Sequence, residues 1–309
     1  MIEIIWSWWA VWVKLQELVE GHPILKNCLS KPCLGLSTLN KPEWNKKIES
    51  ILKNNEIVVL AVDDDVAKQI IDIKTKVWLA TKIIDCSTAH RTNPLWTYGL
   101  PELKWQKDKI ETAELVSNPW CHATAVILSV KPLVDIKLAN NKSGIITSTT
   151  WYSWWGKNMI KAFEKGKNKQ SFQYSTWIEH KHEVEIKNET WLTDFIFQPE
   201  VVNYFNWLKV NVFLNLTSKW QKLSEEDFIE LFNNYYNGAK NMNVSSMPSD
   251  WKISMSENNE TQNVSIYIKK YSSKIQIVTV IDNMMKWAAW AVIQNLNIML
   301  WFNEGMGLE

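Results

Sequence analysis

The sequence predicts a two-domain protein: an α/β domain with a doubly wound parallel sheet, followed by an α+β domain with a mostly antiparallel sheet. The 309 residues suffice for two domains. Strand-like and helix-like segments alternate through residue 118, as in a parallel doubly wound sheet. Beyond residue 118, helices and polar loops separate the strand-like segments. We therefore expect one domain over residues 1–118, which the C-terminal residues 284–309 rejoin, and another over residues 119–283.

Short apolar runs predict the strands of the first domain. Ile2–Ile5, Ile57–Val62 and Ile83–Cys86 have the length and β-branched composition of buried strands. A helical pattern covers Val13–Glu20, and Asp63–Asp65 opens the helix after the strand Ile57–Val62. Aspartate at a helix start is more often a cap than a ligand contact, so we expect a cap there.

Five further strand-like segments predict the sheet of the second domain. Residues 241–263 are polar and rich in Ser and Asn, and we expect them to form a surface excursion. The chain ends in a predicted helix over Lys286–Leu300. The expected strands are 144–149, 195–197, 208–214, 264–270 and 275–281.

Tryptophan and glycine occur in unusual proportions. The chain has 20 Trp and only 9 Gly, whereas average usage of about 7% would give roughly 22 Gly. Many Trp residues lie in polar, turn-like contexts, such as Ser7–Ala10 and Ser153–Gly156, where glycine is typical. We hypothesise that UGA encodes glycine in the source of this chain and stands as tryptophan in the sequence. The alternative is a genuinely Trp-rich binding protein with exposed rings, for example one that binds carbohydrate.

The segment between the first strand and the first helix predicts a nucleotide-binding loop, provided that its tryptophans are glycines. It then reads G-S-G-G-A-V-G, the kind of turn that opens a Rossmann-type domain. Glycine permits the tight turn and close approach of a pyrophosphate, and the helix N-terminus supplies N–H groups. As literal tryptophan the motif does not exist. The cofactor-binding candidates are Trp6, Ser7, Trp8, Trp9, Ala10, Val11 and Trp12.

The next strand favours NADP over NAD. An NAD site would show Asp or Glu at the end of the second strand. Leu34–Thr38 contains no acid and is followed by Lys41. Hydroxyl groups and a cation suit a 2′-phosphate, so we expect NADPH as the cofactor, with Ser37 close to it.

Charge and cysteine usage exclude several classes of protein. The net charge is +1, and neither a basic patch nor an apolar run of about 20 residues occurs, so we expect no nucleic-acid or membrane partner. The four cysteines form no CxxC pair and have no zinc spacing, so we expect no metal site. Reduced thiols in a chain of this size indicate the cytoplasm.

One cysteine lies where a reactive thiol is expected. Cys121 follows Pro119 and precedes a helical run over Ala123–Val134, so it is placed at a helix N-terminus. That position stabilises a thiolate and lowers the pKa of the cysteine. A cysteine at a helix start is more often structural, but the preceding nucleotide loop and the downstream His180–His182 (HKH) favour a nucleophile.

The motif around this cysteine resembles a known family. Ser117–Thr124 (SNPWCHAT) is similar to the S-N-P-G-C-[YH]-x-T motif of N-acetyl-γ-glutamyl-phosphate reductases. Nearly every departure from the family pattern is a Trp in place of a Gly; Trp96 is an exception, because the family tolerates tryptophan there. Residues 24–50 and 241–263 match weakly. Motifs of the shorter (type 2) branch also occur at Asp85–Arg91, Tyr98–Leu103, Trp151–Lys157, His180–His182, Asp282–Trp290 and Gln294–Asn297.

The resemblance implies a fold and a reaction. The fold would be that of glyceraldehyde-3-phosphate and semialdehyde dehydrogenases: an NADP-binding Rossmann domain with a catalytic and dimerisation domain, in a homodimer or homotetramer. The small-molecule substrate would be an acyl phosphate, N-acetyl-L-glutamyl 5-phosphate of arginine biosynthesis. The Cys121 thiolate would displace phosphate to form a thioester, which NADPH would reduce to the semialdehyde.

The resemblance also implies roles for individual residues. His182 would be the general acid and base, with His180 as the second candidate. Ser87 and Asn283 would face the cofactor; Asn283 could also cap the final helix. The substrate-binding candidates are Arg91, Asn118, Ser153 and Lys157.

Other enzymes share this pattern in part. A reductase of the one-carbon-longer aminoadipyl phosphate, from lysine biosynthesis, would share the fold and the nucleophile, and no residue excludes it. Aspartate-semialdehyde dehydrogenase shares the architecture but lacks the N-P-G-C arrangement, so it ranks third.

Overall fold

The described part of the chain forms two compact units. The computed structural model describes residues 1–7, 9–28, 42–137, 139–151, 171–175, 178–203, 207–259, 261–283 and 289–308; at 9–12, 42, 139–142 and 151 only the backbone is described. Unit 1 comprises Met1–Pro101, Trp105–Pro119 and Trp287–Glu309. Unit 2 comprises Glu102–Lys104 and Trp120–Lys286.

Unit 1 contains a parallel sheet, sheet A. Among the described residues its strand order is β1-β2-β3-β5-β4, and every pairing is parallel. The predicted α/β fold with a parallel sheet is therefore confirmed. The second predicted strand, with Ser37, lies outside the described residues. The strands are β1 (Ile2–Trp6), β2 (Ile57–Ala61), β3 (Lys82–Asp85), β4 (Thr97–Tyr98) and β5 (Leu115–Ser117).

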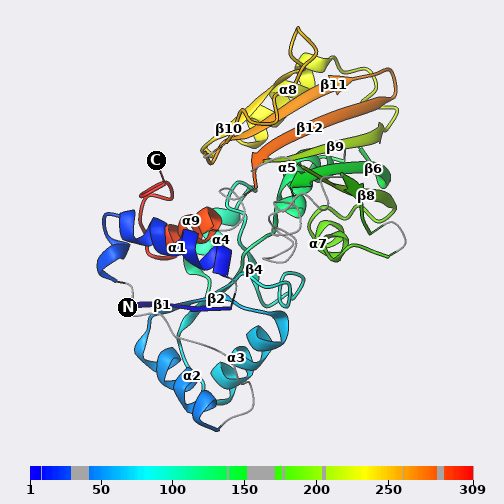
Figure 1. Cartoon of the computed structure of the whole chain (residues 1–309). Coiled ribbons are helices and arrows are strands. Elements are labelled where there is room, and N and C mark those ends of the chain that lie inside the picture. Colours follow the sequence, from blue (N-terminus) through cyan, green and yellow to red (C-terminus); the bar gives the residue numbers. More distant parts are fainter. Residues whose placement is uncertain are drawn as a thin grey trace. The chain divides into compact units, whose positions relative to one another are not determined.

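Helices cover both faces of sheet A. The helices α1 and α9 lie on one face, and α2 and α3 lie on the other (Figure 1). All five residues of β2 are buried, which explains their uninterrupted apolar run. The bounds of the helices are α1 (Trp9–Gly21), η1 (Leu25–Asn27), α2 (Pro42–Asn54), α3 (Asp64–Lys76), α4 (Gln106–Thr112) and α9 (Trp290–Met299).

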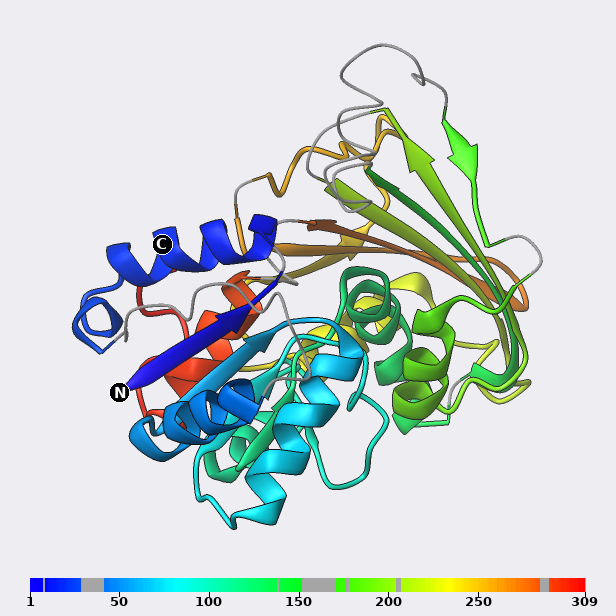
Figure 2. The same ribbon diagram turned by 60° about the horizontal axis from the view of Figure 1, so that its bottom comes forward.

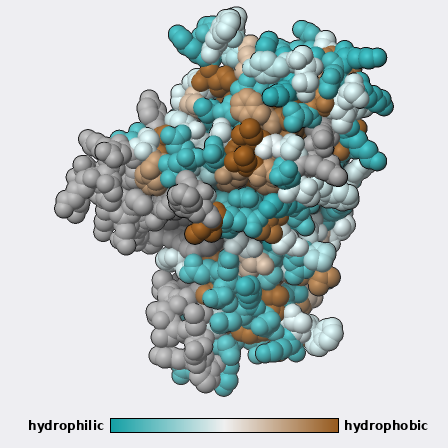
Figure 3. Space-filling view, turned by 90° about the vertical axis from the view of Figure 1, so that its right-hand side faces the viewer, coloured by the Kyte–Doolittle hydropathy of each residue, from teal (hydrophilic) through white to brown (hydrophobic). Residues whose placement is uncertain are grey.

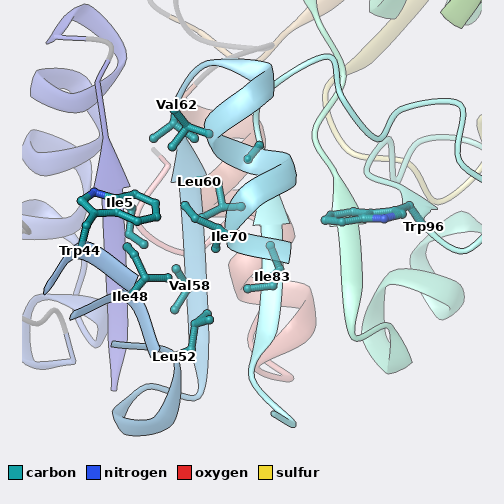
Figure 4. Close-up of a cluster of buried hydrophobic side chains, with 12 residues drawn as sticks. Ile5, Trp44, Ile48, Leu52, Val58, Leu60, Val62, Ile70, Ile83 and Trp96 are labelled. Carbon is teal, nitrogen blue, oxygen red and sulfur yellow. The ribbon is translucent and has the colours of Figure 1, made fainter. Parts of the chain in front are cut away.

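A buried cluster joins α2 and α3 to sheet A. Ile48 and Leu52 of α2 pack towards Val58 of β2, and Ile70 of α3 belongs to the same cluster (Figure 4). Each fully buried aliphatic side chain contributes about 1.5–3 kcal/mol of transfer free energy. The cluster therefore fixes the strands whose carboxyl ends carry the loops of this unit.

Unit 2 contains a mixed sheet, sheet B, with strand order β10-β11-β12-β9-β6-β8-β7 in the described residues. The central pairings of β9 with β6 and β12 are antiparallel, while β6·β8 and β10·β11 are parallel. All five predicted strands are present. The bounds are β6 (Ala139–Trp151), β7 (Phe172–Gln173), β8 (Phe195–Val202), β9 (Trp207–Leu216), β10 (Met242–Ser246), β11 (Val264–Lys270) and β12 (Lys274–Asp282).

Strand β10 lies inside the segment expected to be only a surface excursion. Its side chains are half-buried or exposed, as expected for the outer strand of a sheet. It pairs with β11 through its backbone, from Met242 opposite Val264 to Ser246 opposite Ile268. The polar sequence did not predict this strand, because an edge strand can pair through its backbone with few buried apolar side chains.

The helices of unit 2 pack against one face of sheet B. They are α5 (Cys121–Asp135), α7 (Lys181–Thr190) and α8 (Glu225–Tyr235), and no described helix covers the other face (Figure 2). Nearly every residue of α5 is buried, which is why this helix is apolar on all sides. No helix in the described residues is long and apolar enough to cross a membrane.

Tryptophan occupies most of the left-handed backbone positions. In the described part of the chain, eight residues other than glycine have positive φ, and five of them are tryptophan. Their φ angles lie between 50° and 64°, and all five side chains are exposed, Trp251 by 92%. This conformation favours glycine and is unusual for a bulky residue. The five residues are Trp78, Trp105, Trp191, Trp251 and Trp301.

Three of these tryptophans end helices in motifs that normally use glycine. At the end of α3, the N–H of Leu79 donates to the Lys74 carbonyl (3.2 Å) across Trp78. A bond of the same span crosses Trp301 after α9 (2.8 Å), and Trp191 ends α7 with a bond to the carbonyl four residues earlier (2.9 Å). These are the Schellman and αL patterns, whose left-handed residue is usually glycine.

Replacing an exposed left-handed tryptophan with glycine should stabilise the fold. We expect Trp251→Gly to raise the free energy of unfolding by about 1 kcal/mol, because left-handed backbone costs a non-glycine residue roughly 1–2 kcal/mol. The matched control is Trp96→Gly. Trp96 is 8% exposed and stacks on His90 at 4.3 Å, so its loss should cost about 3–5 kcal/mol. Urea unfolding measures both, and equal losses in the two variants would contradict this account.

Candidate functional site

Cys121 begins helix α5, as the sequence predicts. The chain leaves β5 at Ser117, Trp120 is extended at the N-cap position, and the first helical bond joins Thr124 N–H to the Trp120 carbonyl at 2.8 Å. Trp120 makes no side-chain cap. The N–H groups of the first turn therefore lie at the end of the helix where Cys121, 5% exposed, is placed.

Three histidine rings cluster beside this turn. His122 follows Cys121 in α5, and its ring centroid lies 5.7 Å from that of His180 and 5.3 Å from that of His182. The rings of His180 and His182 are 4.6 Å apart. The Trp120 ring meets His182 edge-on at 5.3 Å. The residues on both sides of Cys121 thus contact His182, which brings together the predicted nucleophile and the predicted acid.

The start of α7 fixes the two downstream histidines. His180 is its N-cap, and Nδ1 of His180 accepts the N–H of His182 at 3.2 Å. The N–H of His180 donates to Glu183 Oε1 at 2.8 Å, which completes a capping box. Both histidines of the H-K-H motif therefore have positions set by helix capping.

Burial keeps two of the histidines uncharged at neutral pH. Desolvation, with a smaller contribution from the neighbouring His180, lowers the pKa of His122 to about 3. Desolvation lowers the pKa of His180 to about 4, with a smaller contribution from the charge of Lys181. A neutral imidazole has one N–H donor and one acceptor, so each of these rings can join a directional hydrogen-bond chain.

His122 links two residues that the sequence did not single out. Its Nδ1 lies 2.6 Å from Ser148 Oγ of β6, and its Nε2 lies 3.1 Å from the Tyr174 hydroxyl. Burial raises the pKa of Tyr174, and the charge of an ionised Cys121 raises it further. No sequence spacing identified Ser148 or Tyr174, because Ser148 lies on β6, Tyr174 follows β7, and both meet His122 only through the fold of unit 2.

Asn283 directly follows β12 and is fully buried. Its Nδ2 donates to Thr150 Oγ1 at 2.9 Å, and no donor among the described residues lies within hydrogen-bond distance of its Oδ1. A buried amide oxygen without a donor among these residues can accept a hydrogen bond from a polar ligand group. This is the residue predicted to face the cofactor.

A buried carboxylate organises the loop after β3 in unit 1. Asp85 Oδ2 accepts the Ser87 hydroxyl at 2.8 Å and lies 2.6 Å from His90 Nδ1. Arg91, predicted to bind substrate, is buried and donates to the Cys86 carbonyl at 2.8 Å. Ser87 is fully buried and its hydroxyl is engaged by Asp85. Asp85 therefore shapes the loop that presents Ser87 and Arg91.

The expected side-chain cap at the acidic start of α3 is not formed by Asp63. Asp63 occupies the N-cap position of α3 but its side chain makes no capping bond. Asp64 instead accepts the N–H of Thr88 at 2.8 Å and also bonds the Thr88 hydroxyl. The acid therefore joins α3 to the loop after β3.

Asn118 is held by the C-terminal helix. Asn295 of α9 donates to Asn118 Oδ1 at 3.1 Å and to the Gly99 carbonyl at 3.0 Å. A Cβ on Gly99 would lie 2.6 Å from the Asn295 amide nitrogen, so this approach requires glycine. The carboxamide of Asn118, a predicted substrate contact, thus has its orientation set from within unit 1.

The other predicted contacts are described in part or not at all. Helix α1 begins at Trp9 shortly after β1, and the N–H of Ser7 donates to the Ala61 carbonyl at 2.9 Å. Trp6 is half-buried; for Trp9, Ala10, Val11 and Trp12 only the backbone is described. Outside the described residues lie Trp8, Ser37, Ser153 and Lys157. No cluster of three His, Cys, Asp or Glu in the described ranges is arranged to hold a metal ion.

Sequence comparison identifies relatives over most of the chain. Residues 121–283 match the sequence profile of the family described as semialdehyde dehydrogenase, dimerisation domain. Proteins named N-acetyl-gamma-glutamyl-phosphate reductase are similar along the chain. The one from Trichormus variabilis is 29% identical over 84% of this chain and 85% of its own. The one from Brucella anthropi is 28% identical over 86% and 90%, and the one from Ruthia magnifica 33% over 69% and 61%.

Solved structures share the fold at lower identity. Aspartate semialdehyde dehydrogenase II from Vibrio cholerae, complexed with ASA, has a TM-score of 0.72 at 11% identity and covers 97% of this chain and 98% of its own. The enzyme from Candida albicans, solved with NADP, has a TM-score of 0.69 at 16% identity over 97% and 98%. At such identities the likeness concerns the fold alone.

The buried histidine should make stability depend on pH. The unfolded chain binds a proton at His122 near pH 6.5, whereas the folded chain does so only at about pH 3. Falling pH therefore favours the unfolded state, by about 1.4 kcal/mol per pH unit between these values. We expect His122→Gln to remove this part of the slope of unfolding free energy between pH 6 and pH 4. Equal slopes in the parent and the variant would show that His122 is protonated in the folded chain.

Proposed function

The chain belongs to the semialdehyde dehydrogenase family, and we propose that it reduces N-acetyl-L-glutamyl 5-phosphate to N-acetyl-L-glutamate 5-semialdehyde and phosphate, with NADPH. This reaction belongs to arginine biosynthesis. The supporting comparisons are the relatives of that name along most of the chain. The observation that carries the proposal is Cys121 in the first turn of α5, directly before His122, whose ring contacts that of His182.

The thiol acts first. The Cys121 thiolate attacks the acyl carbon, a C–S bond forms, and the C–O bond to phosphate breaks, so phosphate leaves with the electron pair. The N–H groups of the first turn of α5 stabilise negative charge on the sulfur. The product of this step is a thioester on Cys121.

His182 is the proposed acid and base. After reduction, the carbonyl oxygen of the thioester becomes an oxyanion, which His182 protonates. When the thiohemiacetal collapses, His182 takes the proton back and Cys121 leaves as thiolate. His180 is bound through Nδ1 to the backbone N–H of His182, so its proposed role is to orient His182, and it is the second candidate for the acid.

The described backbone fits NADPH, whereas tryptophan in the loop after β1 does not. The buried Asn283 Oδ1 has no donor among the described residues, as expected for a contact to a carboxamide. Strand β1 ends at Trp6 and helix α1 begins at Trp9, and a dinucleotide phosphate binds at such a junction of a parallel sheet. Indole rings in this turn would occupy the phosphate position. The chemistry that bound NADPH supplies is a hydride.

We further propose that glycine stands at most tryptophan positions of the native protein. Five exposed tryptophans with left-handed φ support this proposal, and three of them end helices in Schellman or αL motifs, where glycine is usual. The buried indole nitrogens of Trp44 and Trp290 have no hydrogen-bond partner among the described residues, although buried indoles usually have one. Trp96, buried and stacked on His90, is the proposed genuine tryptophan.

The remaining assignments follow the family pattern. We propose that Arg91, Asn118, Ser153 and Lys157 bind the phosphate and carboxylate groups of the substrate, and that Ser87 and Ser37 line the NADPH site. No disulfide joins the three described cysteines, Cys28, Cys86 and Cys121, which supports a cytoplasmic location.

A homo-oligomer is also proposed, either a dimer or a tetramer. On the face of sheet B that no described helix covers, Ile196, Ile145 and Phe213 lie side by side on β8, β6 and β9. Ile196 and Ile145 are exposed by 57% and 48%. Such a row of apolar side chains suits a second copy of this chain. In the view of Figure 3, hydrophilic residues predominate and hydrophobic patches are small.

A reductase assay tests the reaction and its nucleophile. In the chain with glycine at every tryptophan position except 96, we expect NADPH oxidation with N-acetylglutamyl phosphate, and Cys121→Ser should lower kcat by about 10³-fold or more. Cys28→Ser is the matched control and should keep the rate. A faster reaction with aminoadipyl phosphate would overturn the proposed substrate. An undiminished rate in Cys121→Ser would overturn the proposed thioester intermediate.

Peptide mass spectrometry of protein from the native source tests the glycine proposal. We expect glycine masses at positions 8, 9, 78, 120 and 251 and a tryptophan mass at position 96. The chain that carries tryptophan throughout should bind NADPH weakly or not at all, because the loop after β1 is blocked. Tryptophan masses at positions 8, 9 and 120 would refute the proposal, and NADPH-dependent reduction by that chain would contradict the expected block.

A further inference from the structure

A directional hydrogen-bond chain runs from Ser148 to Tyr174 beside the nucleophile. Ser148 Oγ lies 2.6 Å from His122 Nδ1, and His122 Nε2 lies 3.1 Å from the Tyr174 hydroxyl. Ser148 and His122 are 1% and 3% exposed. Water therefore does not compete for these bonds, and their donors and acceptors must be matched within the protein.

The burial of Ser148 fixes the direction of this chain. Among the described residues its hydroxyl has one hydrogen-bond partner, His122 Nδ1. A buried hydroxyl that did not donate would leave an unsatisfied proton, so Ser148 donates and Nδ1 accepts. Because His122 is neutral, the proton of its ring is then on Nε2 and is donated to the oxygen of Tyr174. The Tyr174 proton is left to point at another acceptor.

Cys121 is the acceptor that we infer from its place beside His122. Cys121 directly precedes His122 in the first turn of α5. Burial is the main cause of the raised pKa of the Tyr174 phenol, and the charge of an ionised Cys121 is the second cause. A phenol that keeps its proton at all working pH values remains a donor when the thiol ionises. A histidine at the same place could lose its N–H or change tautomer.

We propose that the Tyr174 hydroxyl donates to the Cys121 sulfur and stabilises its thiolate, with His122 and Ser148 as positioning residues. This inference rests on the proposed function only for the identity of the nucleophile. It separates two tasks in the histidine cluster: His122 orients a donor to the sulfur, whereas His182 exchanges a proton with the substrate oxygen. The donor to the sulfur adds to the helix N–H groups of α5.

The pH dependence of Cys121 alkylation by iodoacetamide tests this inference without substrate or NADPH. The full glycine-carrying chain is used, and peptide mass identifies the alkylated cysteine. Tyr174→Phe should move the midpoint of the profile upward by about one pH unit, because one bond to a charged acceptor is lost. Ser148→Ala should move it in the same direction by less, since His122 can then accept from Tyr174 and divert its proton.

Tyr235→Phe is the matched control. Tyr235 lies in α8 and donates to Asp135 Oδ2 at 2.7 Å, so the variant loses one tyrosine hydrogen bond in the same unit and should keep the parent profile. An unchanged profile in a folded Tyr174→Phe would overturn the inference. If that variant does not fold, an unchanged profile in Ser148→Ala overturns it. A shifted profile in a chain without reductase activity would support the inference and contradict the proposed function.

Discussion

The burial of helix α5 against sheet B is the constraint on which the candidate site depends. Nearly all of α5 is buried inside unit 2. This packing fixes the first turn of the helix, and with it the positions of Cys121 and His122. The same burial removes water from His122 and keeps its ring neutral. Helix α7 then presents His180 and His182 through its own capping box. The surroundings of the Cys121 thiol are thus set by the packing of α5 and the capping of α7.

Much of this arrangement could be predicted from the sequence. Apolar runs identified the buried strands of both sheets, and Pro119 ahead of a helical pattern placed Cys121 at a helix start. The H-K-H motif pointed to His180 and His182. These signals are local, since each depends on the order of a few residues.

The parts that could not be predicted depend on strand pairing. Ser148 and Tyr174 reach His122 from 26 and 52 positions away, and neither carries a local pattern. Strand β10 was hidden because an edge strand needs backbone pairing more than apolar side chains. A helix cap was expected from Asp63–Asp65, but Asp64 instead accepts a hydrogen bond from Thr88, 24 residues along the chain. In each case a partner distant in sequence decided the outcome.

The tryptophans add a second, independent kind of information. Composition raised the question of glycine, but the backbone distinguishes one tryptophan from another. Trp251 is exposed with left-handed φ, whereas Trp96 is buried and stacked. Glycine satisfies the first environment because it has no Cβ, and it would leave a cavity in the second. A single assignment for every tryptophan would therefore conflict with the packing.

The central claim, an acyl group carried by Cys121, can be measured directly. With N-acetylglutamate semialdehyde and NADP⁺ but no phosphate, the thiol adds to the aldehyde, one hydride is transferred, and the thioester cannot be discharged to phosphate. The account predicts a burst of one NADPH per active chain and an acyl mass on the peptide that contains Cys121. NADPH formation with no acyl group on that peptide would contradict it.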